Sequence, residues 1–101
     1  MYIDCIGEGE QLMKKVKDAI AQHKLLAIKD SEGRERTVQP YALFTGKDSI
    51  LLHCYQIGGY SSSGGFGWRN IKLIDIQYAT ILDEVFLISP DYNPDKLRGI
   101  L

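Results

Sequence analysis

The sequence predicts an α+β domain in which one N-terminal helix packs on a small, strongly curved sheet or barrel of about five antiparallel strands. An apolar stripe with helical spacing comes first. Short runs rich in Ile, Leu and Tyr follow it, separated by turn residues. With 101 residues, 45% hydrophobic and 25% charged, the chain can build one core but not two ordinary domains. We therefore predict a single domain over residues 1–101.

The helix is predicted over about residues 8–23, after a short extended lead-in over residues 1–7. Leu12, Val16 and Ile20 recur at intervals of four residues and so form one apolar stripe. The lysines between them fall elsewhere on the helix. A solvated face explains these lysines better than a basic face for an anionic partner does.

The first two strands are predicted over residues 25–29 and 34–44. The segment between them, Asp-Ser-Glu-Gly, has the composition of a reversing turn. Pro40 should bend or break the second strand, because a proline cannot donate to the ladder and is confined to edges and bulges.

A long hairpin of residues 49–57 and 68–75 is the predicted centre of the fold. Apolar side chains occupy both faces of its first strand, as expected for a central strand of a small closed sheet. The Gly-rich connection over residues 58–67 is much longer than a tight hairpin needs. It matches no phosphate-binding loop pattern, because a strand follows it, so we expect a mobile tip that a ligand or neighbour could order.

The last predicted strand covers residues 76–82, and the acidic pair at residues 83–84 suggests a turn. An apolar segment follows at residues 85–88. Residues 89–101 read as an irregular tail, in which an Asn-Pro pair could cap a last helical turn over residues 93–98.

The formal net charge of −1 argues against coating of nucleic acid by bulk electrostatics, although it is compatible with a local basic patch. The sequence shows no signal peptide and no apolar stretch of membrane length, so we expect a cytoplasmic protein with no membrane partner. Cys5 and Cys54 lie far apart and fit reduced thiols better than a disulfide framework. A single bridge between them is the alternative.

Catalysis is the least favoured class of function. His53 and Cys54 are neighbours on a predicted strand, so their side chains should point to opposite faces and cannot form a nucleophile and its base. The two histidines and two cysteines lack the close spacing of a zinc site. We expect a protein that is not an enzyme and that uses no metal or cofactor.

Three segments carry a resemblance to a known family. Residues 36–43 look like an R-x-V-x-P-x-x-L stretch, residues 50–52 fall where a Trp-Tyr-Leu triplet would stand, and residues 69–73 fall on an R-x-F-R-L segment. With the hydrophobic residues around them, these segments make about residues 16–86 resemble the WYL domain. This Sm-like β-barrel module is best known as the effector-binding part of bacterial transcription regulators. The Trp and Tyr of the triplet are absent, so the resemblance is to a divergent, stand-alone member.

The resemblance implies a non-catalytic regulatory module that binds a nucleotide or single-stranded nucleic acid through basic residues. Arg36 and Arg69 are the matching positions, and a guanidinium offers a planar fork of donors that fits phosphate oxygens. Lys72 and Arg34 could widen this patch. Asp75 stands where the family usually has a second arginine, which would weaken anion binding. The alternative for the two arginines is pairing with carboxylates on neighbouring strands.

Aromatic residues near the Gly-rich connection could add to the predicted ligand site. Trp68, with Phe66 and Tyr60, could stack bases, or such a ring could anchor the loop to the core. The rival function is a structural or oligomerisation module. In that case residues 50–57 and 85–88 would offer an exposed strand edge to another copy or another protein.

Overall fold

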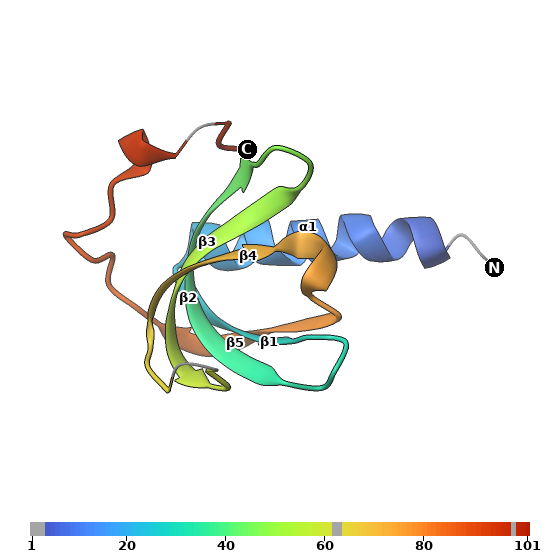
Figure 1. Ribbon diagram of the computed structural model, residues 1–101, viewed down its shortest axis with the longest axis horizontal. Helices are drawn as coiled ribbons and strands as arrows, with labels where there is room; N and C mark the ends of the chain where they lie inside the picture. Colours follow the sequence, from blue (N-terminus) through green and yellow to red (C-terminus); the bar gives the residue numbers. More distant parts are fainter. Residues whose placement is uncertain (1–3, 62–63, 98) are drawn as a thin grey trace.

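The computed structural model describes residues 4–61, 64–97 and 99–101 (Figure 1). One N-terminal helix packs on one five-stranded antiparallel sheet, which confirms the predicted α+β class. In chain order the elements are α1 (Asp4–Gln22), β1 (Lys24–Lys29), β2 (Glu35–Thr45), β3 (Ile50–Gly59), β4 (Gly67–Lys72), the 3₁₀ turn η1 (Leu73–Asp75), β5 (Tyr78–Val85) and the 3₁₀ turn η2 (Pro94–Lys96).

Helix α1 begins earlier than predicted. Residues 4–7 are helical, so the extended lead-in is wrong there, and residues 1–3 lie outside the described part. Val16 and Ala19 are fully buried against the sheet, and once this stripe is anchored each further turn adds hydrogen bonds at little cost. The helix ends at Gln22, and the next residue, His23, takes a positive φ of 54° before β1 begins.

The sheet has the strand order β4-β3-β2-β1-β5, and each neighbouring pair is antiparallel. Among the described residues no ladder joins β4 to β5, so the curved sheet is confirmed and the closed barrel is wrong. The chain leaves β4 through η1, which directs it back toward β1, where Gln77 N–H donates to the Lys29 carbonyl over 2.7 Å. Figure 1 shows the strong bend of the strands, with α1 running across the sheet.

Strand β2 bends where predicted, at Pro40. Its register against β3 shifts between Pro40 and Ala42, which leaves Tyr41 as the extra residue of a bulge. The bulge reverses the alternation of side chains along β2. Val38 and Leu43 are at positions of opposite parity, yet they belong to the same core cluster, and Tyr41 belongs to another cluster.

Two sequence predictions near the end of the sheet are corrected. Strand β4 stops at Lys72, and the residues expected to extend it to position 75 form η1. The pair at residues 83–84 is no turn but lies inside β5. The pairing with β1 steps from Leu26↔Ile81 to Lys24↔Val85, so this exposed acidic pair is accommodated in a bulge of an edge strand.

Two clusters of buried side chains hold the fold together. The main core lies between α1 and the sheet, and it includes Val16, Ala19, Leu26, Ile28, Val38, Leu43, Leu52, Cys54, Leu73, Ile76 and Ala79. A second, aromatic cluster joins Leu25, Tyr41 and Phe86 with the partly buried Tyr55, Trp68, Leu82 and Tyr92. Thus β3 is covered on both faces, as predicted.

The tail over residues 89–101 is tied to the sheet. Ser89 N–H donates to the Tyr41 hydroxyl over 3.0 Å, and Leu101 N–H donates to the Leu43 carbonyl over 2.9 Å. The predicted cap is confirmed, because the Asn93 side chain accepts the backbone N–H of Asp95 at the start of η2. Arg98, at the predicted end of this turn, lies outside the described residues.

Candidate anion-binding pocket

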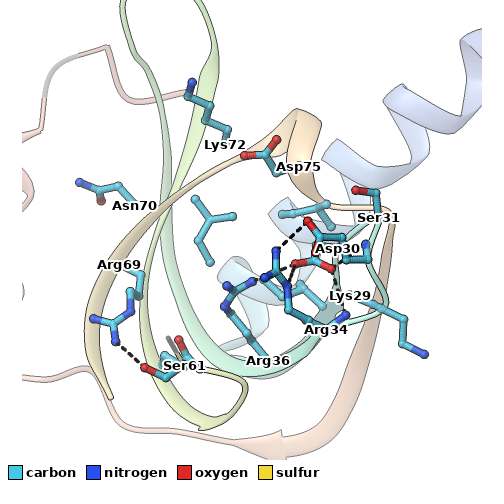
Figure 2. Close-up of a pocket in the computed structure, with 15 residues that line it drawn as sticks. Lys29, Asp30, Ser31, Arg34, Arg36, Ser61, Arg69, Asn70, Lys72 and Asp75 are labelled. Atoms are coloured by element: carbon cyan, nitrogen blue, oxygen red, sulfur yellow. Dashed lines mark hydrogen bonds and ion pairs between the residues drawn. The ribbon is translucent and has the colours of Figure 1, made fainter. Parts of the chain in front are cut away.

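A polar pocket of about 610 Å³ opens between the β1–β2 turn, β3, β4 and η1 (Figure 2). This volume is in the range of small-molecule sites. Five basic and three acidic side chains line the pocket, so its formal charge is positive although the chain as a whole is slightly negative. The charged lining residues are Lys29, Arg34, Arg36, Arg69, Lys72, Asp30, Glu32 and Asp75.

The register of four strands brings the two predicted arginines to the same pocket. Arg36 on β2 is paired with Ile28 on β1, whose side chain is in the main core. Arg69 on β4 is paired with Cys54 on β3, which is also in that core. Because paired residues share a face, both arginines extend from the core side of the sheet, one from each side of β3.

Arg34 and Arg36 share one carboxylate, that of Asp30. Arg34 Nε lies 2.9 Å from Asp30 Oδ2, and Arg36 Nη1 lies 3.8 Å from the same oxygen. The other Asp30 oxygen accepts the backbone N–H groups of Glu32 and Arg34, which fixes the β1–β2 turn. These hydrogen bonds, led by the one from Arg34 N–H, hold the pKa of Asp30 below its usual value.

The ring of Tyr60 contacts this pair of cations. The guanidinium carbon of Arg34 lies 4.7 Å from the centre of the Tyr60 ring, and that of Arg36 lies 5.4 Å from it. Such distances are typical of cation–π contacts. Tyr60 therefore orients the arginines, and it is 37% exposed.

Arg69 differs from the other two arginines because it has no carboxylate partner within the described residues. Its guanidinium donates to the carbonyls of Gly65 at 2.8 Å and Trp68 at 3.2 Å, and to Ser61 Oγ at 3.5 Å. These partners are neutral, so they orient the guanidinium without cancelling its charge. Figure 2 shows Arg69 and Ser61 joined at one side of the pocket and the Arg34–Asp30 cluster at the other.

Lys72 and Asp75 also line the pocket, at its η1 side. Neither forms an ion pair with another described residue. Asp75 stands on η1 rather than on the strand expected from the sequence, so the position of its carboxylate in the pocket depends on the 3₁₀ turn.

Trp68 is placed elsewhere. It is absent from the pocket lining and packs in the aromatic cluster, where its ring stacks on His53 with centroids 4.9 Å apart and planes 6° apart. It also contacts Tyr41 and Tyr92. The pocket therefore gathers Arg34, Arg36, Arg69 and Lys72 of the predicted site, whereas Trp68 anchors the sheet and the tail.

Gln56 is a pocket residue that the sequence reasoning missed. It is fully buried on β3, its Nε2 donates to the carbonyls of Gly58 at 3.0 Å and Tyr60 at 2.6 Å, and its Oε1 accepts no hydrogen bond from the described residues. Its position in the sequence could have identified it, because Gln56 continues the alternating, buried face of Leu52 and Cys54. A polar residue on a buried face needs partners.

Cys54 and His53 lie on opposite faces of β3. Cys54 is a free, buried thiol in the core, and burial raises its pKa to about 12 against the opposing effect of Arg69 and Arg36. On the aromatic side, His53 Nδ1 donates a 2.7 Å hydrogen bond to Asn70 Oδ1. The side chain of Cys5 lies outside the described part, and no cluster of metal-binding side chains occurs within it.

No protein-family model and no curated protein matches this chain. Among solved structures, proteasome accessory factor B/C (PafBC) of Arthrobacter aurescens is similar, with a TM-score of 0.66 and 20% sequence identity. The match supports a WYL-like fold. It covers 85% of this chain but only 14% of the PafBC chain, and at this identity it is a likeness of fold alone. In the described part of the chain, no helix is long and apolar enough to cross a membrane.

Proposed function

We propose that this chain is a non-catalytic regulatory module that binds a nucleotide or single-stranded nucleic acid, with Arg36 and Arg69 as its anion contacts. The WYL-like fold and the name of PafBC as an accessory factor are in keeping with a regulatory role. The cytoplasm is the expected location. Lys72 and Arg34 widen the positive field around the two contacts.

The charge of Arg69 is the observation that carries this proposal. A guanidinium held only by neutral groups, inside a pocket with a second arginine across β3, favours an anion between them. Arg36 is weakly paired, with 3.8 Å to the nearest carboxylate oxygen, so a phosphate can compete for it.

Fluorescence anisotropy of labelled single-stranded DNA and RNA tests the proposal, with unlabelled nucleotides as competitors and a series of salt concentrations. We expect binding that weakens with salt and is lost in the Arg36→Ala/Arg69→Ala double variant. The matched control is Lys14→Ala/Lys47→Ala, which removes the same charge from exposed positions outside the pocket. Equal losses in both double variants, or no binding by folded wild type at low salt, would refute the arginine site.

A second candidate function is self-association through the free edge of β5. The rival prediction that residues 50–57 offer an edge is wrong, because β3 pairs with both β2 and β4. The other predicted segment, residues 85–88, fits better. β5 is an edge strand, and Val85 at its end and Leu87 just after it are 69% and 93% exposed. Light scattering over a range of protein concentrations tests this. A mass that rises with concentration in wild type, but less in Val85→Lys, would support self-association.

A further inference from the structure

One side of β2 is only partly covered by a neighbouring strand. Its ladder with β1 ends at the pair Leu26↔Val38, whereas its ladder with β3 continues to Thr45↔Ile50. Among the described strands, none pairs with the later half of β2 on the β1 side. A strand edge of this kind presents N–H and C=O groups to which an extended segment can add.

Residues 99–101 of the tail occupy this free half of the edge. An antiparallel bridge joins Ile100 to Phe44, and Figure 1 shows the tail returning to the sheet beside the β2–β3 turn. Two backbone hydrogen bonds flank the bridge, from Thr45 N–H to the Gly99 carbonyl over 3.0 Å and from Leu101 N–H to the Leu43 carbonyl over 2.9 Å. The tail therefore binds the sheet as an added peptide strand does, mainly through its backbone.

Gly99 makes this contact selective for its sequence. Its φ is +68°, in the region that favours glycine, and a Cβ there would collide with Thr45 Oγ1 and lie 3.2 Å from Thr45 Cβ. The two tail residues that follow are apolar, and they line an apolar pocket of about 320 Å³ together with Ile20 of α1 and Tyr41 of β2. The edge therefore fits a segment in which a glycine precedes apolar residues.

The docked segment is held by few contacts and hangs on an exposed link. Residues 93–96 are exposed, and Ile100 and Leu101 remain 47% and 52% exposed in the docked state. The seven residues from Tyr92 to Gly99 can span about 23 Å when extended, so the segment can reach a neighbouring molecule while Tyr92 stays in the aromatic cluster. A second copy offers the same segment, so an exchange needs no new complementarity.

We propose that the free half of the β2 edge is a strand-docking site for residues 99–101 of a second copy of this chain. In a single molecule its own tail fills the site. At high concentration two molecules exchange their tails reciprocally. The residues that pair in this contact, 43–45 and 99–101, do not line the anion pocket and lie away from β5, so the inference does not depend on either of the functions proposed above.

Two variants with opposite defects test the exchange. Gly99→Val keeps the edge but spoils the tail segment, whereas Thr45→Pro keeps the segment but removes an N–H that the edge donates to it. That N–H faces the tail, so its loss leaves the hydrogen bonds between β2 and β3 in place. An intramolecular tail acts at an effective concentration in the millimolar range, so sedimentation equilibrium is measured up to about 1 mM. The mass of an equal mixture should rise toward that of a dimer, while each variant alone keeps the mass of a monomer.

The matched control for Gly99→Val is Gly65→Val, because a Cβ at Gly65 meets nothing within 4 Å. Its own tail still fills the edge, so its mixture with Thr45→Pro should remain monomeric. Thermal unfolding of every variant is measured alongside. If Gly99→Val does not fold, Leu101→Pro replaces it, since this change frees the edge by removing the N–H that bonds to the Leu43 carbonyl.

An amide-capped, fluorescent peptide of residues 93–101 tests the occupant directly. By anisotropy it should bind folded Gly99→Val, and bind wild type about tenfold more weakly, because the wild-type tail competes for the edge. The same peptide carrying Gly99→Val should bind neither protein.

Three results would overturn the inference. The first is a mixture of folded Gly99→Val and Thr45→Pro that keeps the mass of a monomer at the highest concentration. The second is association of either variant alone to the same extent as the mixture, which would place the contact elsewhere on the molecule. The third is a peptide that binds Gly99→Val and wild type equally, or that binds neither of them.

Discussion

Single residues set the charge that an incoming anion meets. Asp30 is the internal competitor, because its carboxylate pairs with both Arg34 and Arg36 while its other oxygen holds the turn. An anion that enters the pocket must share these guanidinium groups with Asp30. The turn chemistry of Asp30 could be predicted from the sequence, but this pairing could not, since it depends on where the side chain of the turn comes to rest.

Asp30→Asn should therefore strengthen anion binding. The amide keeps an oxygen for the turn hydrogen bonds but removes the competing charge, and we expect pyrophosphate affinity to rise about twofold to fivefold at low salt. Calorimetry measures this change. The matched control is Glu32→Gln, whose carboxylate in the same turn is 70% exposed and should matter less. An unchanged or lower affinity in Asp30→Asn would show that Asp30 does not compete for the site.

The stability of wild type should also depend on pH through Asp30. Its pKa in the folded chain is below the usual 3.8, so the folded state favours the ionised form. This contribution is complete above about pH 3.8 and is lost as the pH falls through the lower native value. Thermal unfolding is measured between about pH 2 and pH 7, on both sides of the Asp30 pKa. As the pH falls, wild type should lose stability more steeply than Asp30→Asn. Parallel curves would contradict this.

Cys54 should be inert in the folded protein. Its burial and its pKa of about 12 keep the thiol protonated, and thiol reagents react with the thiolate. In a Cys5→Ser background, which leaves Cys54 as the single thiol, we expect labelling at pH 8 to be roughly a hundredfold slower than in urea. Equal rates in the folded and unfolded chain would mean that this part of the core opens readily.

At the scale of the elements, Gly59 at the end of β3 approaches the start of β2 closely. Gly59 has a φ of +87°, and a Cβ there would collide with the Glu35 carbonyl oxygen and lie 2.7 Å from Arg36 Cα. Gly59→Ala should cost about 2 kcal/mol or more in the free energy of unfolding and displace Arg36. The free energy of unfolding measured in urea and the affinity for anions should both fall.

Gly65→Ala is the control for this substitution. Gly65 lies in the same connection, yet a Cβ there meets nothing within 4 Å. Its stability should stay close to that of wild type. If the two alanine variants are equally stable, the approach of β3 to β2 tolerates more movement than the contact distances imply.

The tail depends on its aromatic contacts with the sheet. Tyr92 lies 4.8 Å from Tyr41 and 6.4 Å from Trp68 between ring centroids. Tyr92→Ala should lower the free energy of unfolding by about 1–2 kcal/mol, as measured by urea and circular dichroism. Tyr78→Ala, which removes a ring that is 66% exposed, should cost less. Anion affinity should be unchanged in both, and a loss of affinity in Tyr92→Ala would show that the tail supports the pocket.

The elements were predictable to the extent that local patterns control them. The apolar stripe of α1 and the bend at Pro40 follow from spacing and from proline chemistry. The acidic pair inside β5 was misread as a turn, because an edge bulge and a turn use similar residues. The placement of η1 depends on the contacts between η1 and the core, which no local pattern encodes.

At the scale of the whole molecule, the sheet sorts consecutive residues into two environments. Arg36 and Arg69 could be predicted as site residues because a family pattern marked them, and the strand order then places both in the lining of one pocket. Gln56 could not be assigned in the same way. Its burial depends on the register of β3 with two neighbours, and a 2.6 Å hydrogen bond to the Tyr60 carbonyl fixes its amide.

The alternation of β4 has a practical consequence for anyone who studies this protein in solution. Trp68 is the single tryptophan of the chain, and it packs with His53 and Tyr92 while the next residue, Arg69, lines the pocket. Its intrinsic fluorescence should therefore follow unfolding and the docking of the tail but remain nearly silent when an anion binds. A flat emission signal during a ligand titration would be no evidence against binding.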